Sequence, residues 1–279
     1  MKTVLITGAS SGIGLATAQE FLNRGYQVVA VVRQSQSLNK LAEQFGSQLK
    51  LISCDLFNFK QIENLSTQLN DLNIRQIDVL VNNAGQAVAG PFSEQNFQEI
   101  ETTIQLNVVA LMKVTQVLIP YLIQSAGRII NISSVSGKQG TPFLAAYCAS
   151  KHAIEGFSES LRRELNIYGV RVCLVGPGSV KTPIWTKGFV DIKERYAQSD
   201  YAESFARFIQ FAAEESSQAL EPIEVVKDII HAAESKCPKI RYAPIPRKWK
   251  NWYLPQLFPL TIMDRLVIMI LGLKRRSKC

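Results

Sequence analysis

The sequence is poor in the residues that build metal centres and disulfide frameworks. Its 279 residues include only two histidines, His152 and His231, and five cysteines, none of them in a C-x-x-C pair. An odd number of isolated cysteines suits a reducing compartment better than a disulfide scaffold. We therefore expect no metal site and a cytoplasmic protein.

The chain also lacks repeats, low-complexity blocks and the pattern of a secretory signal. Met1 and Lys2 lead directly into the apolar run Thr3–Thr7, with no separate apolar leader before it. With 47% hydrophobic and 19% charged residues, the composition is ordinary for a globular protein, and the length suffices to bury a large core. These features predict one domain over residues 1–279.

Apolar strand patterns alternate with helical patterns along the chain. The short runs Val28–Val32 and Val79–Val81 are apolar on both faces, as expected of parallel strands covered by helices on both sides. This alternation predicts an α/β fold with a single doubly wound, Rossmann-type parallel sheet that has helices on both faces and is followed by a C-terminal helical extension. The expected strands are Thr3–Thr7, Gln27–Val32, Lys50–Ser53, Val79–Val81, Arg128–Ser133, Val170–Val175 and Ile240–Ala243, and the expected helices cover residues 13–24, 37–46, 59–72, 97–124, 147–168 and 222–235.

A glycine-rich turn joins the first expected strand to the first helix. Gly8, Gly12 and Gly14 follow Thr3–Thr7 directly. Glycines allow a tight turn and a close backbone approach, so the helix N-terminus can present its N–H groups and the positive end of its dipole. The turn predicts a site for the diphosphate of a dinucleotide, although its spacing departs from the common G-x-G-x-x-G pattern. A purely structural turn is the alternative.

Tyr147 and Lys151 lie four residues apart, and Ser134 lies thirteen residues before Tyr147. On one helix, residues at this spacing share a face. We therefore expect the Lys151 ammonium to stabilise a phenolate at Tyr147 and to lower its pKa from the reference value of about 10. A phenol tuned in this way acts as an acid near neutral pH.

These motifs occur together with two more, in a fixed order along the chain. The five are Thr7-Gly8-x-x-x-Gly12-x-Gly14, Asn82-Asn83-Ala84-Gly85, Asn107, Ser134 and Tyr147-x-x-x-Lys151. Over residues 1 to about 185, the chain thereby resembles the classical short-chain dehydrogenase/reductase family. It is most similar to the 17β-hydroxysteroid and retinol dehydrogenase-like branch, judged by the segment from Pro177 to Trp185 and the long tail.

The resemblance implies that a nicotinamide dinucleotide binds to the residues that match the family's motifs. Asp55 would contact the adenine, and Thr182 would bond the nicotinamide carboxamide, together with the backbone of Val180. Asn83 would line the ribose or serve mainly a structural role. The implied set is Gly8, Ser10, Ser11, Gly12, Ile13, Gly14, Arg33, Asp55, Leu56, Asn83, Ala84, Gly85, Tyr147, Lys151, Pro177, Gly178, Val180 and Thr182.

Arg33 bears on the choice between the two nicotinamide cofactors. It follows the second expected strand, where an acidic side chain would accept hydrogen bonds from the ribose of NAD. A guanidinium instead suits a 2′-phosphate, with Ser10 or Ser11 as secondary contacts. Resemblance to NADP-dependent members therefore predicts that NADP(H) is preferred over NAD(H); a solvated surface arginine is the alternative.

The resemblance also implies a role for each catalytic residue. In the reducing direction, Tyr147 donates a proton to the substrate carbonyl oxygen while hydride reaches the carbon, and Ser134 holds that oxygen. Lys151 would contact the nicotinamide ribose, and Asn107 would anchor a water that links Lys151 to solvent. Ser133 is the neighbouring alternative to Ser134, but the thirteen-residue spacing favours Ser134.

The loops expected to face the substrate are mostly apolar. They cover residues 86–92, 138–144 and 184–217, and we expect Phe143 and Trp185 to contact the substrate beside Ser134 and Tyr147. A steroid-, retinoid- or lipid-like ketone, aldehyde or alcohol fits such loops better than a sugar. Residues 184–218 are expected to form a lid, because aromatic and apolar side chains recur there at helical spacing; packing against the body is compatible with that role.

Positive charge is concentrated at the C-terminus. From Lys236 to Cys279, eleven Lys and Arg face one acid, Asp264, for a net charge of +10, whereas the other residues carry 20 basic and 22 acidic groups. The extension 244–279 also holds tryptophans, a tyrosine and the apolar run Leu266–Leu273, which is shorter than the roughly 20 residues that span a bilayer. Peripheral contact with an anionic membrane is one interpretation, and packing on the body with a solvated basic face is the other. We expect no nucleic-acid partner, because no recognised module accompanies the charge.

The sequence therefore predicts an NADP(H)-dependent oxidoreductase that acts on a hydrophobic carbonyl compound or alcohol. The family also implies a homodimer or tetramer formed through the helices at 97–124 and 147–168. A 3-ketoacyl-thioester reductase is the nearest enzymatic alternative. A nucleotide-sensing binding protein and a membrane-associated scaffold are the alternatives of another class.

Overall fold

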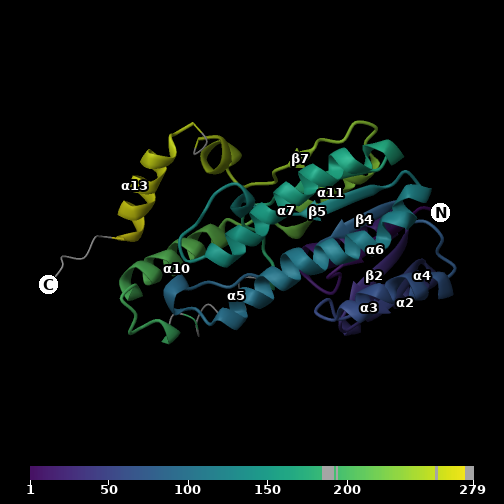
Figure 1. Cartoon of the computed structure of the whole chain (residues 1–279), viewed down its shortest axis with the longest axis horizontal. Coiled ribbons are helices and arrows are strands. Elements are labelled where there is room, and N and C mark those ends of the chain that lie inside the picture. Colours follow the sequence, from purple (N-terminus) through teal and green to yellow (C-terminus); the bar gives the residue numbers. More distant parts are fainter. Residues whose placement is uncertain (184–191, 193, 255–256, 274–279) are drawn as a thin grey trace.

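The computed structural model describes residues 1–183, 192, 194–254 and 257–273. Its centre is a seven-stranded, fully parallel sheet in the order β3-β2-β1-β4-β5-β6-β7 (Figure 1). The chain crosses to the other half of the sheet between β3 and β4, so the order is doubly wound as predicted. The strands are β1 (Thr3–Thr7), β2 (Gln27–Val32), β3 (Leu49–Ser53), β4 (Val79–Asn82), β5 (Arg128–Ile132), β6 (Arg171–Val175) and β7 (Arg241–Tyr242).

The strands are apolar on both faces because helices cover the sheet on both sides. Within β1, Val4 and Ile6 join one core cluster, while Leu5 between them joins the other. Successive side chains of a strand point to opposite faces of the sheet. Because both faces are buried here, nearly every residue of the strand must be apolar. The prediction of a sheet buried between two layers of helices is therefore confirmed.

Three helices cover the first face. They are α1 (Gly12–Asn23), α2 (Asn39–Phe45) and α11 (Pro222–Glu234). Phe21 of α1 and Ile229 of α11 are fully buried in the same cluster, so the two helices pack on each other as well as on the sheet.

The second face is covered by helices from the middle of the chain. They are α3 (Phe59–Glu63), α4 (Leu65–Asp71), α6 (Leu111–Gln124) and α7 (Ala145–Glu164), while α5 (Phe97–Ile104) packs on α7. By length and composition alone, Phe97–Gln124 is apolar enough to cross a membrane. However, Val114, Leu118 and Leu122 of this stretch are buried against the sheet, and the core helix of a globular protein passes the same test.

Several expected helices are interrupted. The stretch 97–124 is not one regular α-helix, because a π-helical segment at Gln105–Ala110 separates α5 from α6. The stretch 59–72 is split into α3 and α4 at Asn64, and residues 165–168 after α7 form a 3₁₀ turn. Such changes of hydrogen-bond register depend on tertiary packing, which a hydrophobic period does not record.

Among the described residues, one further helix lies in the crossover from β6 to β7 and another follows β7. The helix α10 (Ala202–Ser217) precedes α11, and α13 (Leu260–Leu271) closes the described chain after a π-helical turn at Trp249–Tyr253. Figure 1 shows α13 beside α10, at the end of the molecule opposite the N-terminus. The C-terminal extension is therefore helical, as predicted.

Candidate active site

The candidate residues lie where the parallel strands end. Gly8 follows β1, Asn83 follows β4, and Ser134 comes two residues after the end of β5. Because the carboxyl ends of parallel strands meet at one edge, the three loops come together beside the N-terminus of α1.

The glycine turn is as tight as its sequence predicts. Gly8 and Gly12 have φ angles of 65° and 52°, in the left-handed region that favours glycine. A Cβ on Gly14 would lie 2.3 Å from the Gly8 carbonyl oxygen, so no larger residue fits there. Ser11 is the extended N-cap residue of α1, and Leu15 N–H donates the first helical bond to its carbonyl. The N–H groups that precede this bond are those that a helix N-terminus offers to an anion.

Asn83 ties the end of β4 to this turn. Its side-chain amide donates to the carbonyls of Thr7 and Gly8, at 3.0 and 3.1 Å. Its own N–H and that of Ala84 donate to the Thr7 hydroxyl. The side chain of Asn83 therefore holds the loops in place, and Ala84 lies against Gly8, where a Cβ would approach it to 2.9 Å.

Arg33 stands at the rim of a pocket next to the glycine turn. Val32, Ser35, Leu51 and Ser53 line the same pocket, whose volume is about 300 Å³. Arg33 is exposed at this pocket. Further along the edge, after β3, the Asp55 carboxylate accepts a hydrogen bond from Phe57 N–H, and Leu56 is buried.

The segment after β6 closes the other side of the glycine turn. A Cβ on Gly12 would lie 3.0 Å from Cγ2 of Thr182, so Thr182 sits directly over the turn. Val180 is buried and forms a bridge with Leu220, and Pro177 O accepts from Val135 N–H. Gly178 N–H donates to Pro244 O, which joins this segment to the chain after β7.

Tyr147 and Ser134 are buried together. They are only 5% and 7% exposed, and their side chains form a hydrogen bond. The Ser134 hydroxyl also accepts from Ser136 N–H at 3.1 Å. The neighbouring Ser133 instead donates to the Glu155 carboxylate at 2.7 Å, so Ser134 is the serine that faces Tyr147.

Lys151 is buried one helical turn after Tyr147. Its Nζ lies 5.7 Å from the centre of the Tyr147 ring and donates to the main-chain oxygen of Ile132 at 2.9 Å. A Cβ on Gly85 would lie 3.8 Å from this Nζ and 3.2 Å from Oδ1 of Asn107. Four motifs that are far apart in the sequence therefore meet in one place. They are the motifs of Gly85, of Asn107, of Ser134, and of Tyr147 with Lys151.

The expected lowering of the Tyr147 pKa is wrong for this arrangement. Burial has the larger effect and raises the pKa of Tyr147 to about 12, while the hydrogen bond with Ser134 lowers it. Burial also lowers the pKa of Lys151 to about 8, against a smaller rise caused by Glu155. At neutral pH, both groups therefore hold their protons, and Tyr147 is a proton donor.

Asn107 lies in the π-helical segment, and its side chain is fully buried. Its amide accepts from Gln86 N–H and donates to Gln86 O and to Ser150 Oγ, at 2.9 to 3.0 Å. These bonds fix the loop after β4 to α7. A role in anchoring a water stays a prediction.

An apolar cluster includes Tyr147 and the residues around it. Phe143 is buried there and packs against Phe205 and Phe208 of α10, with ring centres 5.2 and 5.6 Å apart. Phe143 has a φ of 68°, a conformation that a bulky residue keeps only where its surroundings hold it. The expected contact Trp185 and the lid residues 184–191 and 193 lie outside the described residues. Residues 192 and 194–218 of that expected lid are described, and their helix α10 packs on Phe143.

Sequence reasoning missed two charged residues behind the site. The Glu155 carboxylate is 6% exposed and accepts from Arg241 Nε at 3.0 and 3.1 Å, besides Ser133. Arg241 also donates to the main-chain oxygen of Ser134 at 3.1 Å, and it stacks on Trp252 at 4.6 Å. The spacing of four residues between Lys151 and Glu155 was a usable signal, because it places both on one face of α7.

Replacing Arg241 with methionine is expected to destabilise the fold by about 3 kcal/mol, because Glu155 is left buried without its main partner. Chemical unfolding measures the loss. Arg24→Met is the matched control: Arg24 pairs with Glu20 and Glu234 at the surface, and such pairs are worth about 0–1 kcal/mol. Equal losses of stability in Arg241→Met and Arg24→Met would contradict the role of Arg241 as the main partner of the buried Glu155.

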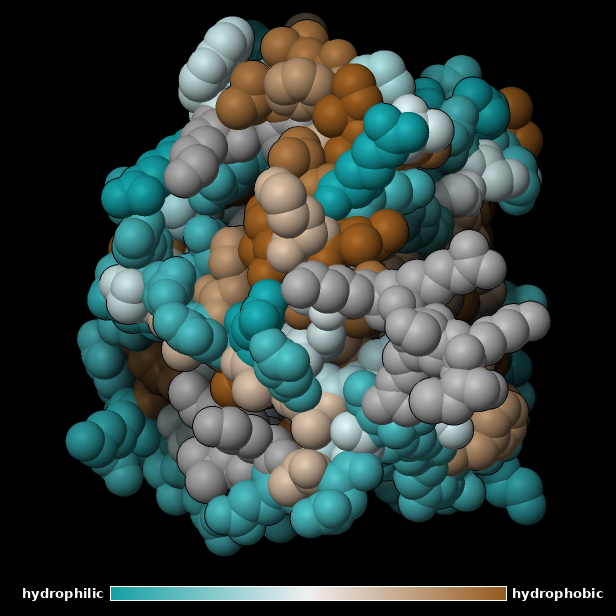
Figure 2. Space-filling model, turned by 90° about the vertical axis from the view of Figure 1, so that its left-hand side faces the viewer, coloured by the Kyte–Doolittle hydropathy of each residue, from teal (hydrophilic) through white to brown (hydrophobic). Residues whose placement is uncertain are grey.

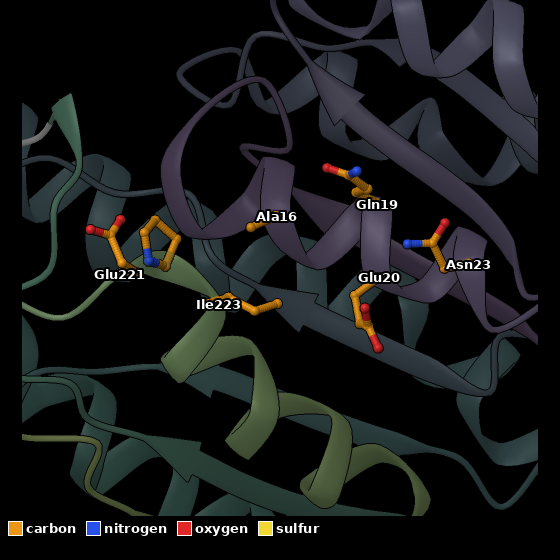
Figure 3. A pocket seen from close by; sticks show the side chains of 7 residues that line it. Ala16, Gln19, Glu20, Asn23, Glu221 and Ile223 are labelled. Carbon is orange, nitrogen blue, oxygen red and sulfur yellow. The ribbon is translucent and has the colours of Figure 1, made fainter.

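A second hollow has no part in this site. Figure 3 shows it between α1 and α11. Its volume is about 470 Å³. Gln19, Glu20 and Asn23 reach it from α1, and Glu221 and Ile223 reach it from the start of α11. None of the residues that line it belongs to the glycine turn or to the Tyr147 cluster.

Comparison with known proteins agrees with this geometry. A family model described as short chain dehydrogenase matches residues 2–192. The chain is 33% identical to NADPH-dependent 3-dehydrocapnine reductase of Ornithobacterium rhinotracheale, over 95% of this chain and 96% of that protein. It is 33% identical to 3-ketodihydrosphingosine reductase of Bacteroides thetaiotaomicron, over 86% of both. The crystal structure of a short-chain dehydrogenase from Streptomyces avermitilis matches with a TM-score of 0.77 at 26% identity, over 92% of this chain and 93% of that one.

Proposed function

The chain belongs to the short-chain dehydrogenase/reductase family, and we propose that it is an NADP(H)-dependent reductase of hydrophobic ketones or aldehydes. The observation that carries the proposal is the buried Tyr147, which holds its proton beside Ser134 and Lys151. A proton donor in this setting suits the reduction of a carbonyl group.

The described residues fit a nicotinamide dinucleotide. The glycine turn has no room for a Cβ at Gly8, Gly12 or Gly14, and it presents the N-terminus of α1, as a diphosphate requires. The pocket at Arg33 lies after β2, where the ribose nearest the adenine belongs in this type of sheet. When bound, the reduced nicotinamide would supply the hydride.

Ser134 and Tyr147 would hold the substrate carbonyl oxygen from two sides. Their existing hydrogen bond places both hydroxyls at one point, so an oxygen that enters there meets a donor already in position. Tyr147 gives its proton to this oxygen as the carbon is reduced. The Lys151 ammonium, 5.7 Å from the ring centre, then stabilises the phenolate that remains.

The rate of reduction is expected to fall as the pH rises through about 8. Tyr147 keeps its proton until about 12, so Lys151 is the first of the two to lose its charge. We expect kcat/KM to be level below about pH 7 and to decline above about pH 9. In Lys151→Arg the charge persists, and the decline should move to higher pH if the variant still binds NADPH. A wild-type profile that stays level to about pH 10 contradicts this assignment.

Arg33→Ala is expected to weaken NADPH binding by roughly 10- to 100-fold and to change NADH binding little. The physical reason is the loss of charge-assisted hydrogen bonds to the 2′-phosphate, worth about 1.5–3 kcal/mol. Titration of nucleotide fluorescence measures both affinities. Arg75→Ala is the matched control, since Arg75 is an exposed arginine before β4 that pairs with Asn70. Equal losses for the two nucleotides refute the role of Arg33.

The substrate class follows from the cluster beside Tyr147. Its buried members include phenylalanine, tyrosine and leucine side chains, so we propose a ketone or aldehyde on a long aliphatic or otherwise apolar body. The names of the two relatives support this, since each describes the reduction of a 3-dehydro or 3-keto compound.

A panel of carbonyl compounds tests the proposal. NADPH oxidation is followed with 3-ketodihydrosphingosine, steroid, retinoid and short aliphatic carbonyls and with a β-ketoacyl thioester. We expect the greatest kcat/KM among the long-chain or polycyclic apolar compounds. A clear preference for the acyl thioester would favour the alternative reductase, and no turnover of any compound would refute the proposal.

A further inference from the structure

The C-terminal helix α13 exposes apolar side chains on most of its surface. Leu260, Met269 and Ile270 are 81%, 68% and 57% exposed, and Ile262, Leu266 and Ile268 are exposed as well. Figure 2, which faces this end of the molecule, shows apolar side chains gathered in its upper part, at the height of α13 in Figure 1. A contiguous patch of this kind marks a surface that meets an apolar partner.

One side of α13 is nevertheless fixed to the body. Leu271 is buried in the cluster that contains Phe143 and Tyr147, and Val267 packs against it. Ser204 of α10 donates to Gly272 O at 3.2 Å. The exposed face is therefore presented by an anchored helix, and an unbroken apolar cluster connects that helix to Tyr147.

Aromatic and basic side chains border the helix. Trp249 is 69% exposed, and its ring lies tilted against that of Tyr253, whose centre is 5.9 Å from the Lys248 ammonium. Arg247 and Arg265 are also exposed. Amphipathic rings and basic groups beside an apolar helix are the pattern of attachment to the surface of an anionic bilayer.

We infer that α13 and the turn at Trp249–Tyr253 dock on the surface of an anionic membrane. At 1.5 Å per residue, the helix is about 18 Å long, so it lies in the interface and does not cross the roughly 30 Å core. If the proposed function holds, docking would place the apolar cluster leading to Tyr147 against the lipids, from which a hydrophobic substrate can enter. This last step rests on the proposed function; the docking itself does not.

Charge favours a membrane over a second copy of this chain. The segment from Lys236 to Cys279 has eleven basic residues and one acidic residue. Two copies joined through α13 would bring these like charges together, whereas anionic lipids complement them.

Vesicle sedimentation tests the inference on the full-length protein. Vesicles of phosphatidylcholine alone are compared with vesicles that contain phosphatidylserine as about a third of the lipid. We expect the wild type to sediment with the anionic vesicles at least about ten times more strongly. The triple variant Leu260→Gln/Met269→Gln/Ile270→Gln should lose binding by about 100-fold or more, because three side chains no longer bury apolar surface.

A matched control and a second readout make the test decisive. Ile167→Gln removes a side chain that is 78% exposed just before β6, at the opposite edge of the sheet, and should leave sedimentation unchanged. All variants should keep their NADPH oxidation rate with a short, water-miscible ketone. Absence of wild-type binding to either vesicle overturns the inference. So does a triple variant that keeps vesicle binding but changes oligomeric state on gel filtration, since α13 then meets a second copy. Failure of short-ketone turnover alone counts against the proposed function and leaves docking standing.

Discussion

Replacing Tyr147 with phenylalanine is expected to lower kcat/KM for carbonyl reduction by roughly 10²- to 10⁴-fold. The ring stays in the cluster with Phe143, so packing is kept and only the proton donor is lost. NADPH affinity should change little, because the glycine turn and Arg33 are untouched. Steady-state kinetics and a nucleotide titration on the same preparation measure the two quantities.

Tyr26→Phe is a close control for this experiment. Tyr26 is also buried, burial also raises its pKa to about 12, and its hydroxyl bonds to Glu234. It lies in the other core cluster, on the face covered by α1 and α11, away from Ser134 and Lys151. We expect near wild-type kinetics for Tyr26→Phe. A Tyr147→Phe variant that turns over at the wild-type rate rules out the assigned proton donor.

Gly14→Ala is expected to disrupt both stability and nucleotide binding. The new Cβ would lie 2.3 Å from Gly8 O and 2.5 Å from Asn83 Nδ2, so the turn must shift. Overpacking of this kind costs about 1–3 kcal/mol of stability. A shifted turn would present its N–H groups less well to a diphosphate, and a loss of about 3 kcal/mol, the upper value for a hydrogen bond to a charged group, would weaken NADPH binding about 100-fold. Thermal unfolding and nucleotide titration measure these effects.

Gly156→Ala is the matched control within another helix. A Cβ at Gly156 of α7 meets no atom within 4 Å, so the substitution removes backbone freedom without a clash. It should stabilise the protein by about 0.5–1 kcal/mol and leave NADPH binding unchanged. If Gly14→Ala and Gly156→Ala change stability and NADPH binding alike, Gly14 is not required for the close packing of the glycine turn.

The sequence predicted the sheet well because local pattern and burial agree there. β1 and β2 begin and end at the predicted residues, and β7 is shorter by one residue at each end. Strands buried on both faces leave a signal in every residue, which explains this success. The π-helical segment at Gln105–Ala110 left no such signal, since its hydrogen bonds depend on how Asn107 meets Gln86 and Ser150.

The sequence predicted which residues form the candidate site, but it did not predict their pKa values. The order and spacing of the motifs predicted that Ser134, Tyr147 and Lys151 belong to one site, and the structure places these three side chains together. The pKa of Tyr147 was predicted with the wrong sign, because the depth of burial is a property of the whole fold. Arg241 lies 86 residues from Glu155, so only the sheet topology reveals their contact.

The most direct test of the account is a titration of the purified protein with NADPH and with NADH, followed by nucleotide fluorescence. We expect saturable binding of NADPH that is tighter than that of NADH, and clearly weaker binding of NADPH by Gly14→Ala. Absence of saturable binding by either nucleotide would contradict the account, because every catalytic role proposed for Tyr147 depends on a nicotinamide held beside it.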